Sequence, residues 1–222
     1  MIYIHKKQTP DFLRKCQSDP QITFKTMHGS DKQNLRHSLC EEQNELCAYC
    51  MKRIRPVESG MKVEHFDPQS HEAGNDLDYN NLLAVCDGKI SSGFSGSTCD
   101  THKGDRTLYI SPLNPDVESM VHYQANGIII ASEKLPEEIQ SQVDADLNDI
   151  LNLNHVWLQR NRKAVLEAYK LQIAKHGRGK GKLPESFWKS EEAKYRLGSR
   201  RNQEYKGIIL DYIAIKRKRA KS

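Results

Sequence analysis

The side chains best suited to chemistry in this chain lie in one polar stretch, residues 47–105. The stretch contains two pairs of cysteines and, between them, a carboxylate beside a histidine and an asparagine ahead of an apolar run. Paired thiols suit a metal ion, and a carboxylate next to an imidazole suits acid–base and metal chemistry on a phosphate ester. The residues are Cys47, Cys50, Glu64, His65, Asn81, Cys86 and Cys99.

The thiol spacing predicts a structural zinc site. Cys47 and Cys50 are separated by two residues, which fits adjacent corners of a tetrahedron. Cys86 and Cys99 lie thirteen positions apart, so the second pair carries an inserted loop, and the glycines and serines of residues 88–98 supply one. In a reducing compartment such thiols indicate zinc more readily than disulfides. The alternative is a set of buried or free thiols.

The polar residues between the thiols predict a hydrolytic site. His65 is the expected general base, because a neutral imidazole accepts a proton near pH 7. Glu64 is the expected hard oxygen ligand for Mg²⁺ or Mn²⁺, and Asp100 is the expected second ligand from the start of a helix. His102 is the alternative ligand, either for this metal or in place of a thiolate. Asn81 is expected to orient the loop of His65 by hydrogen bonding.

Basic side chains offer phosphate contacts outside this constellation. Residues 175–182 alternate lysine and arginine with glycine, which lets a backbone approach phosphates; a flexible linker is the alternative interpretation. The tail 216–219 is equally compatible with a solvated end and with nucleic-acid contact. The residues expected to contact phosphates are Lys103, Lys175, Arg178, Lys180 and Lys182.

Composition places the chain among globular proteins. It has 222 residues, 37% hydrophobic and 28% charged, with a net charge of +5 that does not by itself identify a polyanionic partner. No run approaches the roughly 20 apolar residues of a membrane span. The first residues lack the apolar block of a signal peptide, so we expect a cytoplasmic protein.

Hydrophobic periodicity predicts a mainly helical protein around a small strand-containing core, an α+β fold. We expect a strand that ends at Glu64-His65, and a hairpin turning at Asn126-Gly127. Residues 1–46 should form a strand and helices that pack on a core at 47–110, and 111–222 a hairpin and helical region. The expected elements are a strand at 1–8, a helix at 10–16, a helix that is capped by Ser30 or Asp31 and runs to 47, and helices at 136–175 with a break near 152–154, at 186–198 and at 202–217.

Residues 47–105 resemble the HNH endonuclease family. The family pattern runs Cys-x2-Cys, Asp-His, Asn-Leu and Cys-x2-Cys-(His/Asn)-x2-Lys, on a zinc-bound ββα scaffold. The resemblance implies that His65 is the general base, that Glu64 and Asp100 hold the catalytic metal, and that the four cysteines hold zinc. Three positions depart from the pattern: Glu64 stands for the usual Asp, the last thiol pair is spread apart, and Asp100 fills the His/Asn position.

The whole chain is more faintly similar to the HNH nuclease component of Septu-type antiphage systems, also found with retrons. In those systems the nuclease works with an ABC/SMC-like ATPase, so the resemblance implies such a partner. It also implies a nucleic-acid substrate, with DNA expected before RNA.

Two alternatives to a defence nuclease are compatible with the residues. One is a non-catalytic zinc module that binds DNA or a protein, and the other is a toxin nuclease released by a regulator. A structural zinc module needs none of the catalytic candidates, so their joint presence favours an enzyme. These candidates are Glu64, His65, Asn81 and Asp100.

Overall fold

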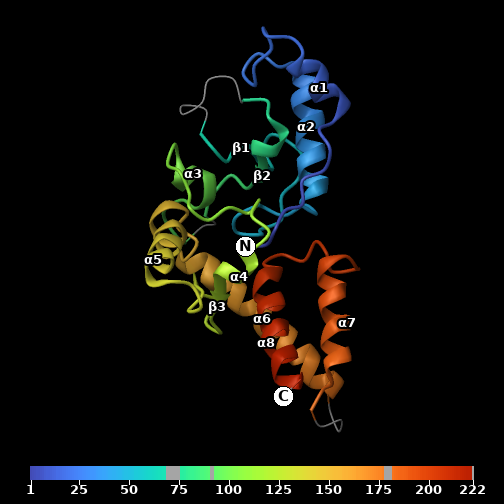
Figure 1. Cartoon of the computed structure of the whole chain (residues 1–222), viewed down its shortest axis with the longest axis vertical. Coiled ribbons are helices and arrows are strands. Elements are labelled where there is room, and N and C mark those ends of the chain that lie inside the picture. The colour runs from blue at the N-terminus through green and yellow to red at the C-terminus, as the bar shows by residue number, and fades with distance from the viewer. Residues whose placement is uncertain (69–75, 91–92, 178–181, 222) are drawn as a thin grey trace.

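Helices dominate the described part of the chain, and its strands form two small sheets (Figure 1). This is the mainly helical α+β architecture expected from the sequence. The computed structural model describes residues 1–68, 76–90, 93–177 and 182–221. The helices are α1 (Asp11–Gln17), α2 (Gly29–Glu42), α3 (Cys99–Lys103), α4 (Val117–Met120), α5 (Glu137–Ala145), α6 (Val156–Gly177), α7 (Glu185–Arg196) and α8 (Lys206–Lys221), and the short turns are the 3-10 helix Tyr79–Asn81 and the π-helix Asp146–Ile150.

Two antiparallel strands and a short helix form the ββα unit of the molecule. β1 (Lys62–His65) pairs with β2 (Leu82–Val85) in the register that sets Glu64 opposite Leu83. The side chains of β2 are all buried, because this apolar run lies between β1 and α2. The strand expected to end at Glu64-His65 is confirmed, and α3 follows close by (Figure 1).

A narrow loop explains how Cys86 and Cys99 meet despite their separation in sequence. Lys89 and Ser97 form an antiparallel bridge, and the Thr98 N–H donates to the Gly88 carbonyl at 3.0 Å. Gly88 has φ +66°, and a Cβ there would lie 2.3 Å from the Thr98 carbonyl oxygen. Only glycine fits this close approach, which brings Cys99 back towards Cys86.

The N-terminal segment departs from the prediction in two places. Residues 1–8 form no regular secondary structure and pair with no strand of the described residues, so the expected strand is wrong; the Ile4 N–H donates to the Pro112 carbonyl at 2.8 Å. The N-cap of helix α2 is His28 rather than the expected Ser30 or Asp31, so the helix begins two or three residues earlier than predicted; the His28 imidazole accepts from the Ser30 N–H. It ends at Glu42 rather than at 47, since Asn44 and Glu45 adopt positive φ values of 54° and 60° and turn the chain.

The C-terminal half follows the predicted order. β3 (Val121–Tyr123) and β4 (Ile129–Ala131) form the expected hairpin. Gly127 has φ +92°, and a Cβ there would lie 2.1 Å from the Gln159 carbonyl oxygen, so the turn packs directly on α6. The expected long helix breaks into α5, a π-helical turn and α6, with the break at the predicted place.

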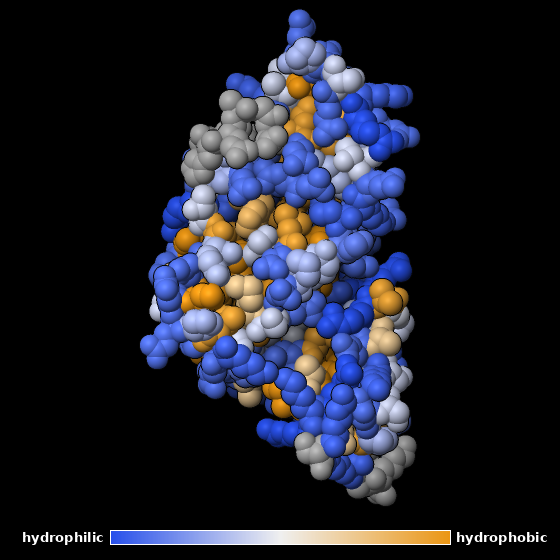
Figure 2. Space-filling view, viewed as in Figure 1, coloured by the Kyte–Doolittle hydropathy of each residue, from blue (hydrophilic) through white to orange (hydrophobic). Residues whose placement is uncertain are grey.

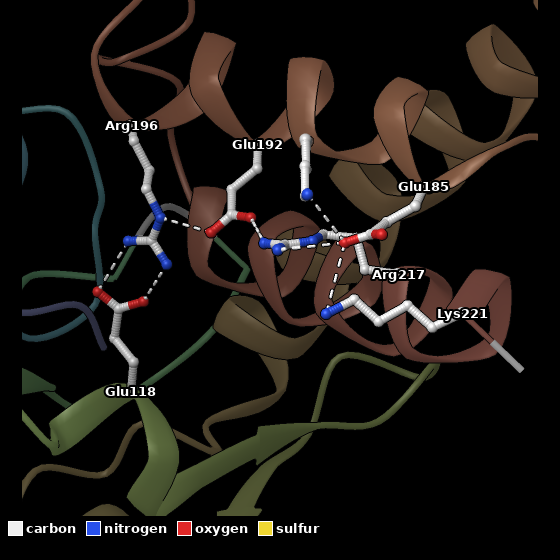
Figure 3. Close-up of polar contacts among 7 residues, drawn as sticks. Glu118, Glu185, Glu192, Arg196, Arg217 and Lys221 are labelled. Atoms are coloured by element: carbon white, nitrogen blue, oxygen red, sulfur yellow. Dashed lines mark hydrogen bonds and ion pairs between the residues drawn. The ribbon is translucent and has the colours of Figure 1, made fainter.

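Ion pairs join the helical hairpin α7–α8 to the rest of the molecule. Figure 3 shows a chain of alternating charges across these helices. Arg196 lies 2.8 Å from Glu118 of α4 and 2.8 Å from Glu192 of α7, and Arg217 of α8 pairs with Glu192 and Glu185. Charged side chains that each pair with more than one partner form a network, which contributes more to stability than isolated surface ion pairs do.

The face shown in Figure 2 is mostly hydrophilic, with hydrophobic residues in patches. Such patches also reach the surface among α6, α7 and α8 at the lower end of that view. None of the helices in the described part of the chain is both long and apolar enough to span a membrane.

Candidate metal and catalytic site

The four predicted cysteines converge on one point. Their sulfur atoms all lie within 4.8 Å of one another, and all four residues are buried. Cys47 and Cys50 come from the turn before β1, Cys86 follows β2, and Cys99 opens α3. The expected thiol cluster is therefore confirmed, and its place at the base of the ββα unit joins all three of its elements.

The cluster has the donor set and size of a tetrahedral metal centre. The Sγ atoms of Cys47 and Cys99 are 4.0 Å apart, and those of Cys50 and Cys86 are 3.7 Å apart. A tetrahedron of sulfurs about 2.3 Å from zinc has edges of about 3.8 Å. None of these cysteines forms a disulfide. The four thiols can thus hold a metal ion, with small movements that close the wider sulfur–sulfur distances.

Glu64 is a buried carboxyl group in contact with both a cation and another acid. Its Oε1 lies 2.8 Å from the Lys103 ammonium and accepts from the Tyr49 hydroxyl at 3.1 Å. Burial, together with the hydrogen bond and the negative charge of Asp100, raises the pKa of Glu64 to about 8. A divalent cation bound between two neighbouring carboxylates would relieve the repulsion between their negative charges.

Asp100 occupies the first turn of α3 and faces the strand. The Lys62 ammonium lies 2.9 Å from its Oδ2 and also donates to the neighbouring Thr101 hydroxyl. Burial alone would raise the pKa of Asp100, but the hydrogen bond with Glu64 and the charge of Lys62 lower it overall. Asp100 is therefore the ionised partner of the acid pair, as a metal ligand should be.

His65 is held as a neutral ring at the end of β1. Its Nε2 lies 2.8 Å from the Asp76 carbonyl oxygen, and the ring edge meets Phe24 with 5.1 Å between centroids. A carbonyl can only accept a hydrogen bond, so Nε2 carries the proton and Nδ1 is the basic nitrogen. Burial lowers the pKa of His65 and so favours this neutral form.

Asn81 closes the loop that follows His65. Its Oδ1 accepts from the Asp67 N–H at 2.8 Å, and its Nδ2 donates to the Asp67 carbonyl at 3.0 Å. Its own carbonyl accepts from the Phe66 N–H at 2.9 Å. Asn81 therefore fixes the backbone next to His65 by three hydrogen bonds, which is the position that the sequence predicted for it.

The remaining predicted residues occupy different surroundings. The His102 Nδ1 lies 3.4 Å from the Ser97 hydroxyl, and no contact with Glu64 is seen in the described part of the chain. Lys103, expected at a phosphate, is buried on Glu64. Lys175 and Lys182 are exposed near the end of α6 and the start of α7. Two further predicted phosphate contacts, Arg178 and Lys180, lie outside the described residues.

Two residues of the site were missed at the sequence level. Lys62 precedes Glu64 by two positions, and on a strand this spacing sets both on the same face. The two-residue repeat of a strand could therefore have predicted that Lys62 lies on the same face as Glu64, near Asp100. Tyr49 lies between the two cysteines of the first pair, and nothing in its sequence context indicated a hydrogen bond to Glu64.

Sequence comparison with known proteins identifies the family. The chain is 32% identical to "Retron Vc95 putative HNH endonuclease" from Vibrio cholerae serotype O1 biovar El Tor, over 175 residues that cover 75% of this chain and 80% of that protein. The chain belongs to this family of retron HNH endonucleases.

A second relative gives the same description over a shorter region. The chain is 37% identical to "Retron Ec83 putative HNH endonuclease" from Escherichia coli over 79 residues, 31% of each protein. No general family model matches the chain. The expected HNH endonuclease in a retron or antiphage setting is thus confirmed.

Proposed function

We propose that this HNH endonuclease is metal-dependent and cuts DNA at the ββα unit. The observation that carries the proposal is the convergence of Glu64 on β1 and Asp100 in the first turn of α3, next to His65 at the end of β1. The two acids are held by Lys103, 2.8 Å from Glu64, and by Lys62, 2.9 Å from Asp100. Glu64 and Asp100 would hold Mg²⁺ or Mn²⁺, hard cations that prefer carboxylate oxygens and keep positions open for phosphate and water. When bound, the cation supplies a positive charge that stabilises the phosphate in the transition state.

The protein's own residues supply the proton transfer. His65 accepts a proton at Nδ1 from the attacking water, while its Nε2–H stays donated to the Asp76 carbonyl. That second hydrogen bond orients the ring and stabilises the imidazolium that forms. Asn81 holds the adjacent backbone, so the ring keeps its position during the proton transfer.

Zinc is the proposed occupant of the thiol cluster, with a structural role. Four thiolates leave no open position for water or substrate, which is the arrangement of structural rather than catalytic zinc. The purified protein should contain about one zinc per chain. A folded preparation with almost no zinc would contradict this assignment.

The activity is tested with plasmid DNA and with RNA, each incubated with Mg²⁺, with Mn²⁺ or without added divalent metal. Cleavage should require the metal, and His65→Ala should lower it by roughly 10²–10⁴-fold. His37→Ala is the matched control, because His37 is an exposed histidine of α2. Equal cleavage by His65→Ala would remove His65 from the mechanism. A zinc-loaded wild type that cleaves neither substrate would instead favour the non-catalytic zinc module.

An ATPase partner is proposed from the similarity to Septu-type nucleases, with residues 111–222 as the binding region. Leu197, at the end of α7, supports this placement because it is 86% exposed, more than the other large hydrophobic residues described as exposed. Leu197→Asp should abolish co-purification with an ATPase encoded beside this gene. Val57→Asp is the control, since Val57 is also exposed but lies in the nuclease half. Co-purification that survives Leu197→Asp would exclude this surface.

A further inference from the structure

Two basic segments that are far apart in the sequence meet at one end of the helical hairpin. Lys182 follows α6, while Lys216 and Arg219 lie in the last turns of α8. All three line a single cavity of about 370 Å³. Figure 1 shows this end of α6, α7 and α8 at the opposite end of the molecule from α1 and the ββα unit.

The basic tail of α8 has two faces of different charge balance. On one face, Arg217 and Lys221 approach Glu185 at 3.8 and 3.5 Å (Figure 3). On the other face, Lys216 and Arg219 form no ion pair with any carboxylate of the described residues. The positive charge is therefore neutralised on the α7 side and left available on the cavity side.

The walls of the cavity are apolar and aromatic. Lys216 lies 5.3 Å from the centroid of the Tyr212 ring, and Lys170 lies 5.5 Å from it. Of these two lysines, Lys216 lines the cavity, so its contact holds a cation there next to an aromatic ring. The walls are formed by Ile173, Leu183, Trp188 and Tyr212.

We propose that this cavity binds single-stranded nucleic acid, with a base against the aromatic wall and phosphates on Lys182, Lys216 and Arg219. Strand-binding proteins combine these two features, aromatic surfaces for bases and cations for the backbone. A duplex keeps its bases stacked, so only an unpaired base can enter an apolar cavity. The proposal rests on the proposed function, because it assigns this site to the nucleic acid that the nuclease engages.

The site lies away from the predicted catalytic residues, which gives it a separate role. A strand held at the end of α8 would be tethered to the enzyme without occupying the ββα unit (Figure 1). Loss of this contact should weaken binding and leave the chemistry at His65 intact. The two activities are therefore separable by substitution.

The test uses full-length protein carrying His65→Ala, so that bound strands are not cut. A cavity variant, Lys182→Gln with Lys216→Gln and Arg219→Gln, is compared with a control variant, Lys163→Gln with Lys189→Gln and Lys221→Gln. Both remove the same charge, but each control lysine is exposed and paired with a glutamate. Fluorescence anisotropy with a labelled single-stranded oligonucleotide, over a range of salt concentrations, gives the affinity and its salt slope.

The cavity variant should bind about tenfold more weakly, and its log–log salt slope should fall by about two, since each phosphate contact on a single strand contributes about 0.7. The control should keep both values. Tyr212→Leu should weaken binding without changing the slope, because it removes stacking and leaves the cations. A duplex of the same sequence should be less sensitive to the cavity variant.

Equal losses in the cavity and control variants, or an unchanged salt slope, would overturn the proposal. Binding of an acidic peptide to the cavity, with no binding of the oligonucleotide, would also overturn it and would make the cavity a protein-binding site. The same substitutions in a protein with intact His65 separate this inference from the proposed function. If metal-dependent cleavage continues but the cavity variant binds the oligonucleotide as tightly as the control variant does, the cavity proposal is rejected and the proposed function is not.

Discussion

The ammonium of Lys103 lies 2.8 Å from Oε1 of Glu64, and the exposed fractions of the two side chains are 1% and 7%. The pair connects α3 to β1 directly beside Asp100. A cation that approaches the two acids therefore meets a fixed positive charge at the same place. Breaking a buried pair is costly, because the remaining group is left without its partner.

Lys103→Met should bind Mn²⁺ about tenfold more tightly than the wild type while cutting DNA more slowly. The tighter binding follows from the removal of a repelling charge, and the slower cleavage follows from the loss of the buried ion pair that connects α3 to β1 beside the two acids. Calorimetric titration with Mn²⁺ in a His65→Ala background measures the first effect, and plasmid cleavage measures the second. Weaker Mn²⁺ binding in Lys103→Met would show that this lysine organises the site instead of opposing the cation.

The choice between the two candidate metal ligands is settled by a pair of substitutions. Asp100→Ala should lose cleavage by at least tenfold, with partial recovery in excess Mn²⁺, because Asp100 contacts Glu64. His102→Ala should stay near wild-type activity, because the His102 imidazole contacts Ser97. An inactive His102→Ala beside an active Asp100→Ala would reverse the assignment. Zinc content of both variants shows whether the thiol cluster was disturbed.

The sequence predicted the cysteine cluster because metal geometry leaves few alternatives for paired thiols. It could not show how Cys86 and Cys99 meet, since the close approach of Gly88 to Thr98 is a contact between backbones. The position of His65 was predictable from the strand that ends there. Its hydrogen bond to Asp76 was not, because the two residues are eleven positions apart and the partner is a backbone carbonyl rather than a side chain.

The prediction for Lys103 shows a different limit. Charge at a helix end normally indicates a solvated or phosphate-facing group, and only the packing of α3 on β1 reveals that this lysine is buried. The N-terminal segment failed for a related reason. The alternation of Ile2 and Ile4 with polar residues indicates a strand, but a strand also needs a neighbouring strand to pair with. The sequence alone does not show whether the fold places such a strand beside this segment.

Arg162 should act as a countercharge for the metal centre. It is 1% exposed and donates to the carbonyls of Gly127 and Leu153, and it forms no ion pair with a carboxylate of the described residues. Burial lowers the pKa of Arg162, and the charges of Tyr123 and Cys50 oppose that shift. Four thiolates around Zn²⁺ carry two net negative charges, which would compensate the buried guanidinium.

Arg162→Met should therefore lower zinc affinity by about tenfold, as substitutions around a metal site do, while Arg162→Lys should retain more of it. Competition with a chromogenic chelator measures the affinity. Unfolding of the zinc-loaded and zinc-free proteins provides the control for a merely structural role. Equal destabilisation of both forms by Arg162→Met, with unchanged zinc affinity, would show that Arg162 serves only its carbonyl partners.

Lys206 gives a prediction for stability against pH. It is 2% exposed at the start of α8, its ammonium donates to the Arg201 carbonyl at 2.5 Å, and burial together with the charge of Arg196 lowers its pKa to about 8. The unfolded chain has the ordinary lysine pKa of about 10.4, so it binds the proton more tightly than the folded protein does. The protonated lysine thus destabilises the fold in full below pH 8, and this cost disappears as the pH rises from about 8 to about 10.

Lys206→Met should consequently raise the free energy of unfolding at pH 7 by about 1–2 kcal/mol, the relief of the buried charge less one lost hydrogen bond. The advantage should shrink between pH 8 and pH 10, since the wild-type lysine is then neutral in the folded state. Urea unfolding at intervals across this range measures it, with Lys163→Met as the exposed-lysine control. Ionisation of the tyrosines affects the wild type and both variants alike, so the difference between them isolates Lys206. A difference that stays constant with pH would show that packing, and not the buried charge, sets the effect.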